Sequence, residues 1–341
     1  MATARSSTRC RSSRLPELPG LPLSRPGPSR TLVTGASGFA GAWLCRACAA
    51  AGEEVTGLSR RGTVPDDGGR GLAVDLRDGE TVTDAVRSVA PTVVYHLAAL
   101  SSVGRSWQEP AETLNDNVAT AVNLLEALRR EAPGARLVWV STCEVYGDPD
   151  VLPAPEDAPM HPANPYAVSK ATGELLADVY ATSHGLDIVR ARPFSHSGPG
   201  QRPIYIQSSL ARQAAEGRRA GVSRLRIVTG NGATRRDFTD VRDVVRAYRL
   251  LAEHAAPGVY NVSSGASVSA SEQVALLARL VAPIEVEHVI DPARVRANEA
   301  MDLRGDHSRL TAATGWEPAI PLRQTMADAI AWWELELART E

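Results

Sequence analysis

Tyr166 and Lys170 are the two side chains of this sequence best suited to move a proton. They lie four positions apart in the stretch 164–170, so on a helix both project from the same face. Lys170 is also the only lysine, since the other 36 of the 37 basic residues are arginine. An ammonium close to a phenol favours the phenolate, so the pair predicts a lowered pKa for Tyr166. Such a hydroxyl supports carbonyl reduction or alcohol oxidation.

A glycine-rich turn near the start of the chain predicts a site for a dinucleotide. The apolar run 30–34 leads into glycines spaced G-x-x-G-x-x-G and then into a helical run. Glycine permits the tight turn and lets backbone N–H groups approach a pyrophosphate at the N-terminus of the helix. The spacing differs from G-x-G-x-x-G, but the order of strand, turn and helix is the same. The predicted cofactor-binding residues of the turn are Gly35, Ser37, Gly38, Phe39 and Gly41.

The end of the second expected strand predicts which dinucleotide is bound. The run 54–58 ends in Ser59, Arg60 and Arg61, where an NAD site usually has an acidic side chain for the ribose 2′-hydroxyl. A small hydroxyl followed by two guanidinium groups instead suits a 2′-phosphate. We therefore expect NADP(H) as the preferred cofactor and NAD(H) as the alternative. Two solvated surface arginines would give the same sequence.

The elements that must hold these residues alternate between strands and helices. Further strands are expected at 71–74, 92–97, 136–140 and 186–191, and a helix at 112–131. This alternation predicts an α/β fold with a doubly wound, Rossmann-like parallel sheet, whose ligands bind at the carboxyl ends of the strands. The further residues expected along the cofactor are Asp75, Leu76, Leu97, Ala98, Ala99 and Asn117.

The regular alternation stops after Pro193, which divides the chain into two interleaved parts. We expect a dinucleotide-binding domain at 30–193 that also includes the returning segment 240–262. A smaller, C-terminal substrate-binding lobe is expected from 194–239 and 263–335. Residues 1–29 are rich in Arg, Ser and Pro and lack hydrophobic periodicity, so a disordered extension is expected there.

The composition indicates a soluble globular protein and argues against several other classes. A net charge of −2 gives no reason to expect nucleic acid or an anionic membrane as a partner. No apolar run is long enough to span a bilayer. Cys45 and Cys48 lie in a helical run, and no second pair or histidine cluster completes a metal site. We therefore expect no metal and a cytoplasmic location.

Four motifs, in chain order, resemble those of a known family. They are Thr34-Gly35-x-x-Gly38-Phe39-x-Gly41, His96-Leu97-Ala98-Ala99, Ser141-Thr142-x-Glu144-Val145-Tyr146-Gly147 and Tyr166-x-x-x-Lys170. With them the chain resembles the extended short-chain dehydrogenase/reductases over residues 30–335, most closely those that remodel nucleotide sugars. The stretches 193–201 and 235–243 look most like reductases of GDP-4-keto-6-deoxymannose.

The resemblance implies NADPH-dependent reduction of the C4 ketone of a nucleotide-linked 4-keto-6-deoxyhexose, with GDP expected and dTDP as the alternative. It implies that Thr142 hydrogen-bonds the carbonyl oxygen, Tyr166 protonates the alkoxide, and Lys170 binds the nicotinamide ribose. Pro193 and the backbone after it would position the carboxamide, and His196 is a further residue expected to bind the cofactor. A homodimer through the helix of Tyr166 and its neighbour is also implied. The substrate-binding residues implied are Ser101, Ser102, Ser195, Arg236 and Arg296.

Glu144 leaves a second reaction open. In 4,6-dehydratases of the same superfamily, a Thr-x-Glu carboxylate removes the C5 proton during internal elimination of water, and Thr142-Cys143-Glu144 has that form. The glutamate could instead orient a loop, and the stretch 235–239 favours the reductase. A C4 epimerase is a further variant. A scaffold that senses the cofactor without catalysis is the alternative from another class, and it would not need a proton donor such as Tyr166.

Overall fold

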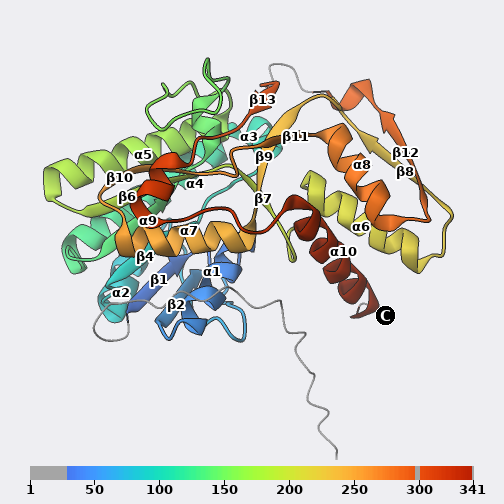
Figure 1. Ribbon diagram of the computed structural model, residues 1–341. Helices are drawn as coiled ribbons and strands as arrows, with labels where there is room; N and C mark the ends of the chain where they lie inside the picture. The colour runs from blue at the N-terminus through green and yellow to red at the C-terminus, as the bar shows by residue number, and fades with distance from the viewer. Residues whose placement is uncertain (1–28, 296–299, 340–341) are drawn as a thin grey trace, which may run out of the picture.

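The computed structural model describes residues 29–295 and 300–339, which form a larger and a smaller part (Figure 1). The larger part is built on a seven-stranded sheet of order β10-β6-β5-β4-β1-β2-β3, in which every pairing is parallel. Its strands are β1 (Arg30–Thr34), β2 (Glu54–Ser59), β3 (Arg70–Ala73), β4 (Val93–His96), β5 (Arg136–Val140), β6 (Asp187–Pro193) and β10 (Gly258–Val262). The order reverses between β1 and β4, so the predicted doubly wound fold is confirmed. The extension expected at 1–29 lies outside the described residues, except for Ser29.

Helices cover both faces of this sheet, which explains why its strands are apolar without alternation. Leu32 and Val33 are neighbours in β1, both fully buried, and belong to cores on opposite faces. One face carries α1 (Phe39–Ala50) and α7 (Val241–His254). The other carries α2 (Gly79–Val89), α4 (Pro110–Glu131) and α5 (Pro165–His184).

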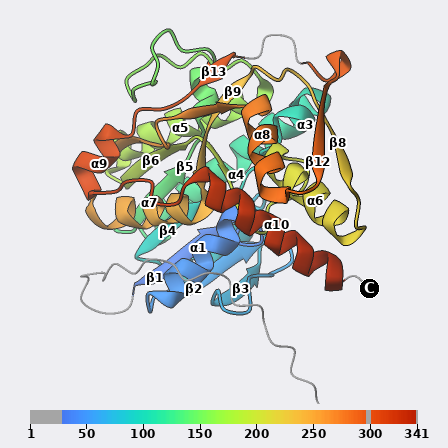
Figure 2. The same ribbon diagram turned by 45° about the vertical axis from the view of Figure 1, so that its right-hand side comes forward.

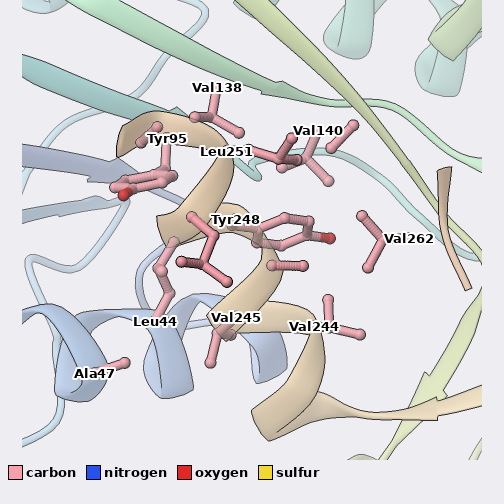
Figure 3. Close-up of a cluster of buried hydrophobic side chains, with 14 of the residues drawn as sticks. Leu44, Ala47, Tyr95, Val138, Val140, Val244, Val245, Tyr248, Leu251 and Val262 are labelled. Carbon is pink, nitrogen blue, oxygen red and sulfur yellow. The ribbon is translucent and has the colours of Figure 1, made fainter. Parts of the chain in front are cut away.

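Helix α7 lies beside α1 on the same face of the sheet, with α1 on β1 and β2 and α7 on β5 and β6; Figure 3 shows the contact between the two helices. The side chains of α7, including Tyr248 and Leu251, fill the space between Leu44 of α1 and Val140 of β5. The strand that follows α7, β10, pairs in parallel with β6 and completes the edge of the sheet. A segment far along the chain therefore supports the strands at whose ends the site was expected.

The smaller part has a core of its own. Three helices, α6 (Ile206–Arg219), α8 (Ala270–Val281) and α10 (Leu322–Arg339), pack with the paired strands β8 (Arg224–Thr229) and β12 (Glu285–Ile290). Figure 2 shows α10 in front of this part, running toward the C-terminus. The Arg242 guanidinium at the start of α7 contacts the Asp328 carboxylate of α10 at 2.7 Å, which ties the two parts together.

A small sheet joins the two parts. It consists of β7 (Ser195–Ser197), β9 (Arg235–Asp240), β11 (Ser267–Ser269) and β13 (Asp302–Leu303), with β9 pairing all three others. The helix α9 (Ser308–Thr314) then packs on α7 and β10. Part of the segment 263–335, expected in the smaller lobe, therefore lies against the larger part, because its apolar residue Leu310 is buried in the core beside α7.

The part of the chain that the structure describes lacks two kinds of feature, a membrane-spanning helix and a cluster of metal ligands. No helix in it is long and apolar enough to cross a bilayer. No group of three or more His, Cys, Asp or Glu side chains in it is arranged to hold a metal ion. Cys45 and Cys48 are free and buried in α1, and burial raises the pKa of Cys45 to about 12.

Candidate active site

The turn between β1 and α1 is packed too closely to accept a side chain at two of its glycines. A Cβ at Gly41 would lie 2.2 Å from the Gly35 carbonyl oxygen, and one at Gly35, where φ is +70°, would lie 2.9 Å from the Ala98 nitrogen. The Gly38 N–H donates to the Gly35 carbonyl at 2.9 Å and closes the turn. Helix α1 begins at Phe39 without a side-chain cap from any described residue and without an acid in its first turn. Its first N–H groups are therefore suited to an anion such as a pyrophosphate.

The residues that follow β2 and β3 differ in how strongly their side chains interact with the rest of the protein. The Ser59 hydroxyl accepts from the Thr63 N–H at 2.9 Å and donates to its carbonyl at 3.1 Å. Arg60 and Arg61, by contrast, are exposed. The Asp75 carboxylate, expected to reach the adenine, forms an ion pair with Arg77 at 2.6 Å, and hydrogen bonding from that guanidinium lowers the pKa of Asp75 to about 2.

Asn117 ties the segment after β4 to helix α5. Its side-chain oxygen accepts from the Leu100 N–H at 2.7 Å, and its side-chain nitrogen donates to the Ser169 hydroxyl at 2.8 Å and the Leu100 carbonyl at 3.2 Å. The amide is buried and already bonded, so the structure gives Asn117 a positioning role. The small or apolar residues expected along the cofactor are all buried or partly buried: Leu76, Leu97, Ala98 and Ala99.

The structure brings Thr142, Tyr166 and Lys170 together at the carboxyl end of β5. Tyr166 and Lys170 are buried on the face of α5 that meets the sheet. The Thr142 hydroxyl lies close enough to the Tyr166 phenol to lower its pKa. The Lys170 ammonium donates to the Val140 carbonyl at 2.5 Å and lies 5.8 Å from the centre of the Trp139 ring.

The pKa of Tyr166 is raised, so the predicted lowering by Lys170 is wrong for this structure. Burial is the largest cause of the raised pKa; the Thr142 hydroxyl opposes this effect, and the charge of Glu144 adds to it. The charge of Lys170, whose ammonium donates to the Val140 carbonyl, does not outweigh the effect of burial. Tyr166 therefore keeps its proton at neutral pH. Burial also lowers the pKa of Lys170 to about 8, while Glu174 raises it.

Glu144 lies in the 3-10 turn η1 (Cys143–Tyr146), close to Tyr166. Its carboxylate accepts a hydrogen bond from the Asn164 side chain at 3.0 Å. Asn164 also caps α5, because its side-chain oxygen accepts from the Ala167 N–H at 2.8 Å. The sequence-based prediction missed Asn164, although an asparagine directly before Pro165 at the first helical position is a recognisable cap signal.

The residues after β6 meet the start of α1. The rings of His196 and Phe39 are stacked, with centroids 6.0 Å apart and an interplanar angle of 8°. Burial lowers the pKa of His196, so its ring is neutral. Pro193 is buried at the end of β6, and Ser195 is partly buried where β7 pairs with β9. The structure thus brings two separately predicted cofactor-binding segments into contact.

The predicted substrate-binding residues are more scattered. Ser101 is exposed, while the Ser102 hydroxyl caps the short helix α3 (Val103–Gln108). The Arg236 guanidinium donates to two backbone carbonyl oxygens at 2.7 and 2.8 Å. Burial raises the pKa of Cys143 and the charge of Arg236 opposes this, which places Arg236 near η1. Arg296 lies outside the described residues.

Tyr205, at the start of α6, is a second residue that the sequence-based prediction missed. Its phenol contributes to the raised pKa of Tyr166, so it acts on the site from the smaller part. The side chain is 37% exposed, and no short motif surrounds it that would have singled it out.

The fold and the buried group of Thr142, Tyr166 and Lys170 define an oxidoreductase of the extended short-chain type. The family model for GDP-mannose 4,6 dehydratase matches residues 32–329, so the chain belongs to this family of nucleotide-sugar enzymes. It is similar to GDP-6-deoxy-D-mannose reductase of Pseudomonas aeruginosa, with 38% identity over 308 residues that cover 89% of this chain and 97% of that one. UDP-glucose 4-epimerase of Mycolicibacterium smegmatis is 32% identical over 321 residues, with 89% and 98% covered.

A solved structure of the Pseudomonas aeruginosa protein RMD, complexed with NADPH, superposes with a TM-score of 0.80 at 35% identity. The match covers 90% of this chain and 99% of that one. The predicted family and enzyme class are confirmed, and a preference for NADP(H) is consistent with this neighbour. Because the relatives include a reductase and an epimerase and the family is named for a dehydratase, the reaction has to be argued from the site.

Proposed function

We propose that this protein reduces the C4 ketone of a nucleotide-linked 4-keto-6-deoxyhexose to the alcohol, with NADPH as the hydride donor. The observation that carries the proposal is that Thr142, Tyr166 and Lys170 are buried together at the end of β5, with the Thr142 hydroxyl close enough to Tyr166 to lower its pKa. A tyrosine that keeps its proton is the form needed to protonate an alkoxide. Similarity to GDP-6-deoxy-D-mannose reductase over nearly its whole length supports the proposal and favours GDP over dTDP.

The residues present suit the cofactor. The close-packed turn at Gly35 and Gly41 and the uncapped start of α1 would hold the pyrophosphate. The exposed Arg60 and Arg61 would hold a 2′-phosphate. Lys170 would bind the nicotinamide ribose. When bound, the nicotinamide supplies the hydride that reaches the ketone carbon.

The chain's own residues supply orientation and the proton. Thr142 donates a hydrogen bond to the ketone oxygen and fixes the carbonyl for attack. As the carbon gains the hydride, Tyr166 transfers its phenolic proton to that oxygen, so the ketone becomes an alcohol and the tyrosine a phenolate. The Lys170 ammonium stabilises this phenolate until solvent returns the proton. Burial strengthens these interactions, because few waters screen them.

A 4,6-dehydratase is the second candidate, because Glu144 lies close enough to Tyr166 to raise its pKa. As a base, its carboxylate would remove the C5 proton. Two observations favour the reductase: the Glu144 carboxylate is engaged by Asn164, and Tyr166 is held in the protonated form, whereas a dehydratase begins by taking a proton from the C4 hydroxyl.

The test is to mix purified protein with NADPH and a GDP- or dTDP-linked 4-keto-6-deoxyhexose and to follow the loss of NADPH absorbance. A reductase consumes NADPH stoichiometrically, whereas a dehydratase turns over GDP-mannose with only catalytic cofactor. Tyr166→Phe should bind NADPH like wild type and lose the reduction. Absence of NADPH oxidation with both ketosugars would refute the proposal.

We also propose a homodimer formed through α4 and α5. Val168, Leu175 and Val179 of α5 are 39%, 56% and 54% exposed and lie on one stripe of the helix. An exposed apolar stripe of this kind favours association. Leu175→Glu should convert the dimer to a monomer in size-exclusion chromatography with light scattering.

The free, buried thiols, among them Cys143, are compatible with the expected cytoplasmic location.

A further inference from the structure

The segment 198–201 connects the end of β7, in the small sheet, with the smaller part of the molecule. Gly198 and Gly200 lie at positive φ, +154° and +89°, so the chain turns at both residues. Pro199 and Gln201 are buried, whereas Gly200 is exposed. Because buried backbone carbonyls need hydrogen-bond donors, the donors that reach this segment show which elements hold it.

Helix α1 of the larger part holds the segment from one side. The Trp43 indole N–H donates to the Pro199 carbonyl at 2.9 Å, and the Trp43 side chain is 3% exposed. One turn earlier on α1, the Phe39 ring stacks on His196, and a Cβ at Gly198 would lie 3.9 Å from the Phe39 ring. These contacts come from the first two turns of α1, whose start is suited to the pyrophosphate of the cofactor.

Three hydrogen bonds join the other end of the segment to the smaller part. The Trp333 indole N–H of α10 donates to the Ser208 hydroxyl of α6 at 3.0 Å, and that hydroxyl donates to the Gln201 carbonyl at 2.5 Å. The Gln201 side chain in turn donates to the His196 carbonyl at 2.8 Å. Ser208 and Gln201 are 2% and 6% exposed, so little water competes for these bonds.

We infer that Trp43 and Trp333 are positioning residues, which hold the segment 198–201 between them and so couple the cofactor turn to the smaller part. The first two turns of α1 become restrained when the cofactor pyrophosphate binds at their start. The contacts of Phe39 and Trp43 pass this restraint to the segment, and Ser208 passes it to α6 and α10. Such coupling is reciprocal, so a substrate bound on the smaller part strengthens cofactor binding by the same factor. The effect on the substrate rests on the proposed function.

A second connection between the two parts does not run through the segment. The Arg242 guanidinium at the start of α7 contacts the carboxylates of Asp240 on β9 and Asp328 on α10, at 2.8 and 2.7 Å. This buried group keeps the two parts joined when a hydrogen bond of the segment is removed. Loss of coupling can therefore be measured without loss of the overall arrangement.

Hydrogen-exchange mass spectrometry with NADPH alone tests the inference without a substrate. In wild type, NADPH should slow exchange in the turn 35–41, in the segment 198–201 and in both α6 and α10. Trp43→Phe keeps an aromatic ring without the N–H, and Ser208→Ala loses one oxygen. In each variant the protection should remain in the turn and be lost from α6 and α10. Protection confined to the turn in wild type, or unchanged protection of the two helices in the variants, would overturn the inference.

Trp316→Phe is the matched control. The Trp316 side chain is fully buried, and its indole N–H donates to the Asp243 carbonyl at 3.0 Å, so the substitution removes a bond of the same kind. This bond joins the residues after α9 to α7 and lies outside the path from α1 to α10. The exchange pattern should match that of wild type. A loss of protection in α6 and α10 here would also contradict the inference, since general loosening would then explain the pattern. If Trp43→Phe does not fold, the comparison is made between Ser208→Ala and the control.

Kinetics separate the inference from the proposed function. In the ketone reduction assay, Trp43→Phe and Ser208→Ala should each raise KM for the ketosugar by about fivefold and leave kcat nearly unchanged. Because both changes interrupt one path, the double variant should have the KM of the single variants. A KM raised by the product of the two effects would indicate two independent losses and count against the coupling. A protein that shows the exchange pattern but reduces no ketone would refute the proposed function and leave the coupling intact.

Discussion

Replacing Lys170 by methionine should make the folded protein more stable at neutral pH while it removes activity. Burial lowers the pKa of Lys170 from 10.5 to about 8. At about 1.4 kcal/mol for each tenfold change in proton affinity, the charged side chain destabilises the fold by about 3 kcal/mol. Methionine has a similar length and no charge, but it loses the hydrogen bond to the Val140 carbonyl, which contributes about 1 kcal/mol. The expected net gain is therefore about 2 kcal/mol.

The pH dependence identifies the cause. A lysine whose pKa is lower in the folded than in the unfolded state destabilises the fold fully below the folded pKa, since both states are then charged. As pH rises from about 8 toward 10.5, the folded side chain loses its proton first and wild type regains the difference. The free energy of unfolding of Lys170→Met and wild type, measured by denaturant titration, should differ most near neutral pH and converge in this window.

Lys170→Arg is the control, because a guanidinium keeps its charge throughout this range. Its difference from Lys170→Met should not shrink as pH rises. If Lys170→Met were less stable than wild type at neutral pH, or if their difference did not depend on pH, burial of the ammonium would not be the main cause of the difference in stability and the reasoning would fail.

Three further changes test other parts of the site. Gly41→Ala places a Cβ 2.2 Å from a backbone oxygen of the turn, so NADPH affinity in a fluorescence titration should fall by about tenfold or more. Asn164→Ala removes the cap of α5 and the partner of Glu144, so the free energy of unfolding should fall by about 1 kcal/mol, together with kcat. Replacing Arg60 and Arg61 by serine should lower kcat/KM for NADPH more than for NADH; equal losses would argue against a 2′-phosphate site.

The parallel sheet was predictable because its strands are apolar runs with turn residues at their ends. β1 and β5 begin and end where the sequence predicts, at Arg30–Thr34 and Arg136–Val140. β6 continues past the expected end at 191 to Pro193, because its last residues still pair with β10. The strands β7, β11 and β13 have only two or three residues, and their pairing with β9 defines them more than their own sequence does.

The site was predictable where a short motif carries it and not where distant segments meet. Helical spacing puts Tyr166 and Lys170 on one face, and a strand end places Thr142 beside them. No local pattern indicates that Arg192 meets Glu174 or that Asn117 bonds Ser169, since these contacts depend on how β6 and α4 pack against α5.

The pKa of Tyr166 shows why residue types and spacing predict a group of side chains better than they predict its electrostatics. A prediction from spacing includes the charge of Lys170 but leaves out the desolvation of Tyr166 on burial. In the structure, this desolvation has the largest effect on the pKa of Tyr166. The consequence for mechanism is an order of events. A buried phenol that holds its proton can act first as an acid, and the Lys170 ammonium matters most afterwards, when the proton has gone to the substrate and a phenolate remains. This is the order of events that the proposed reduction requires.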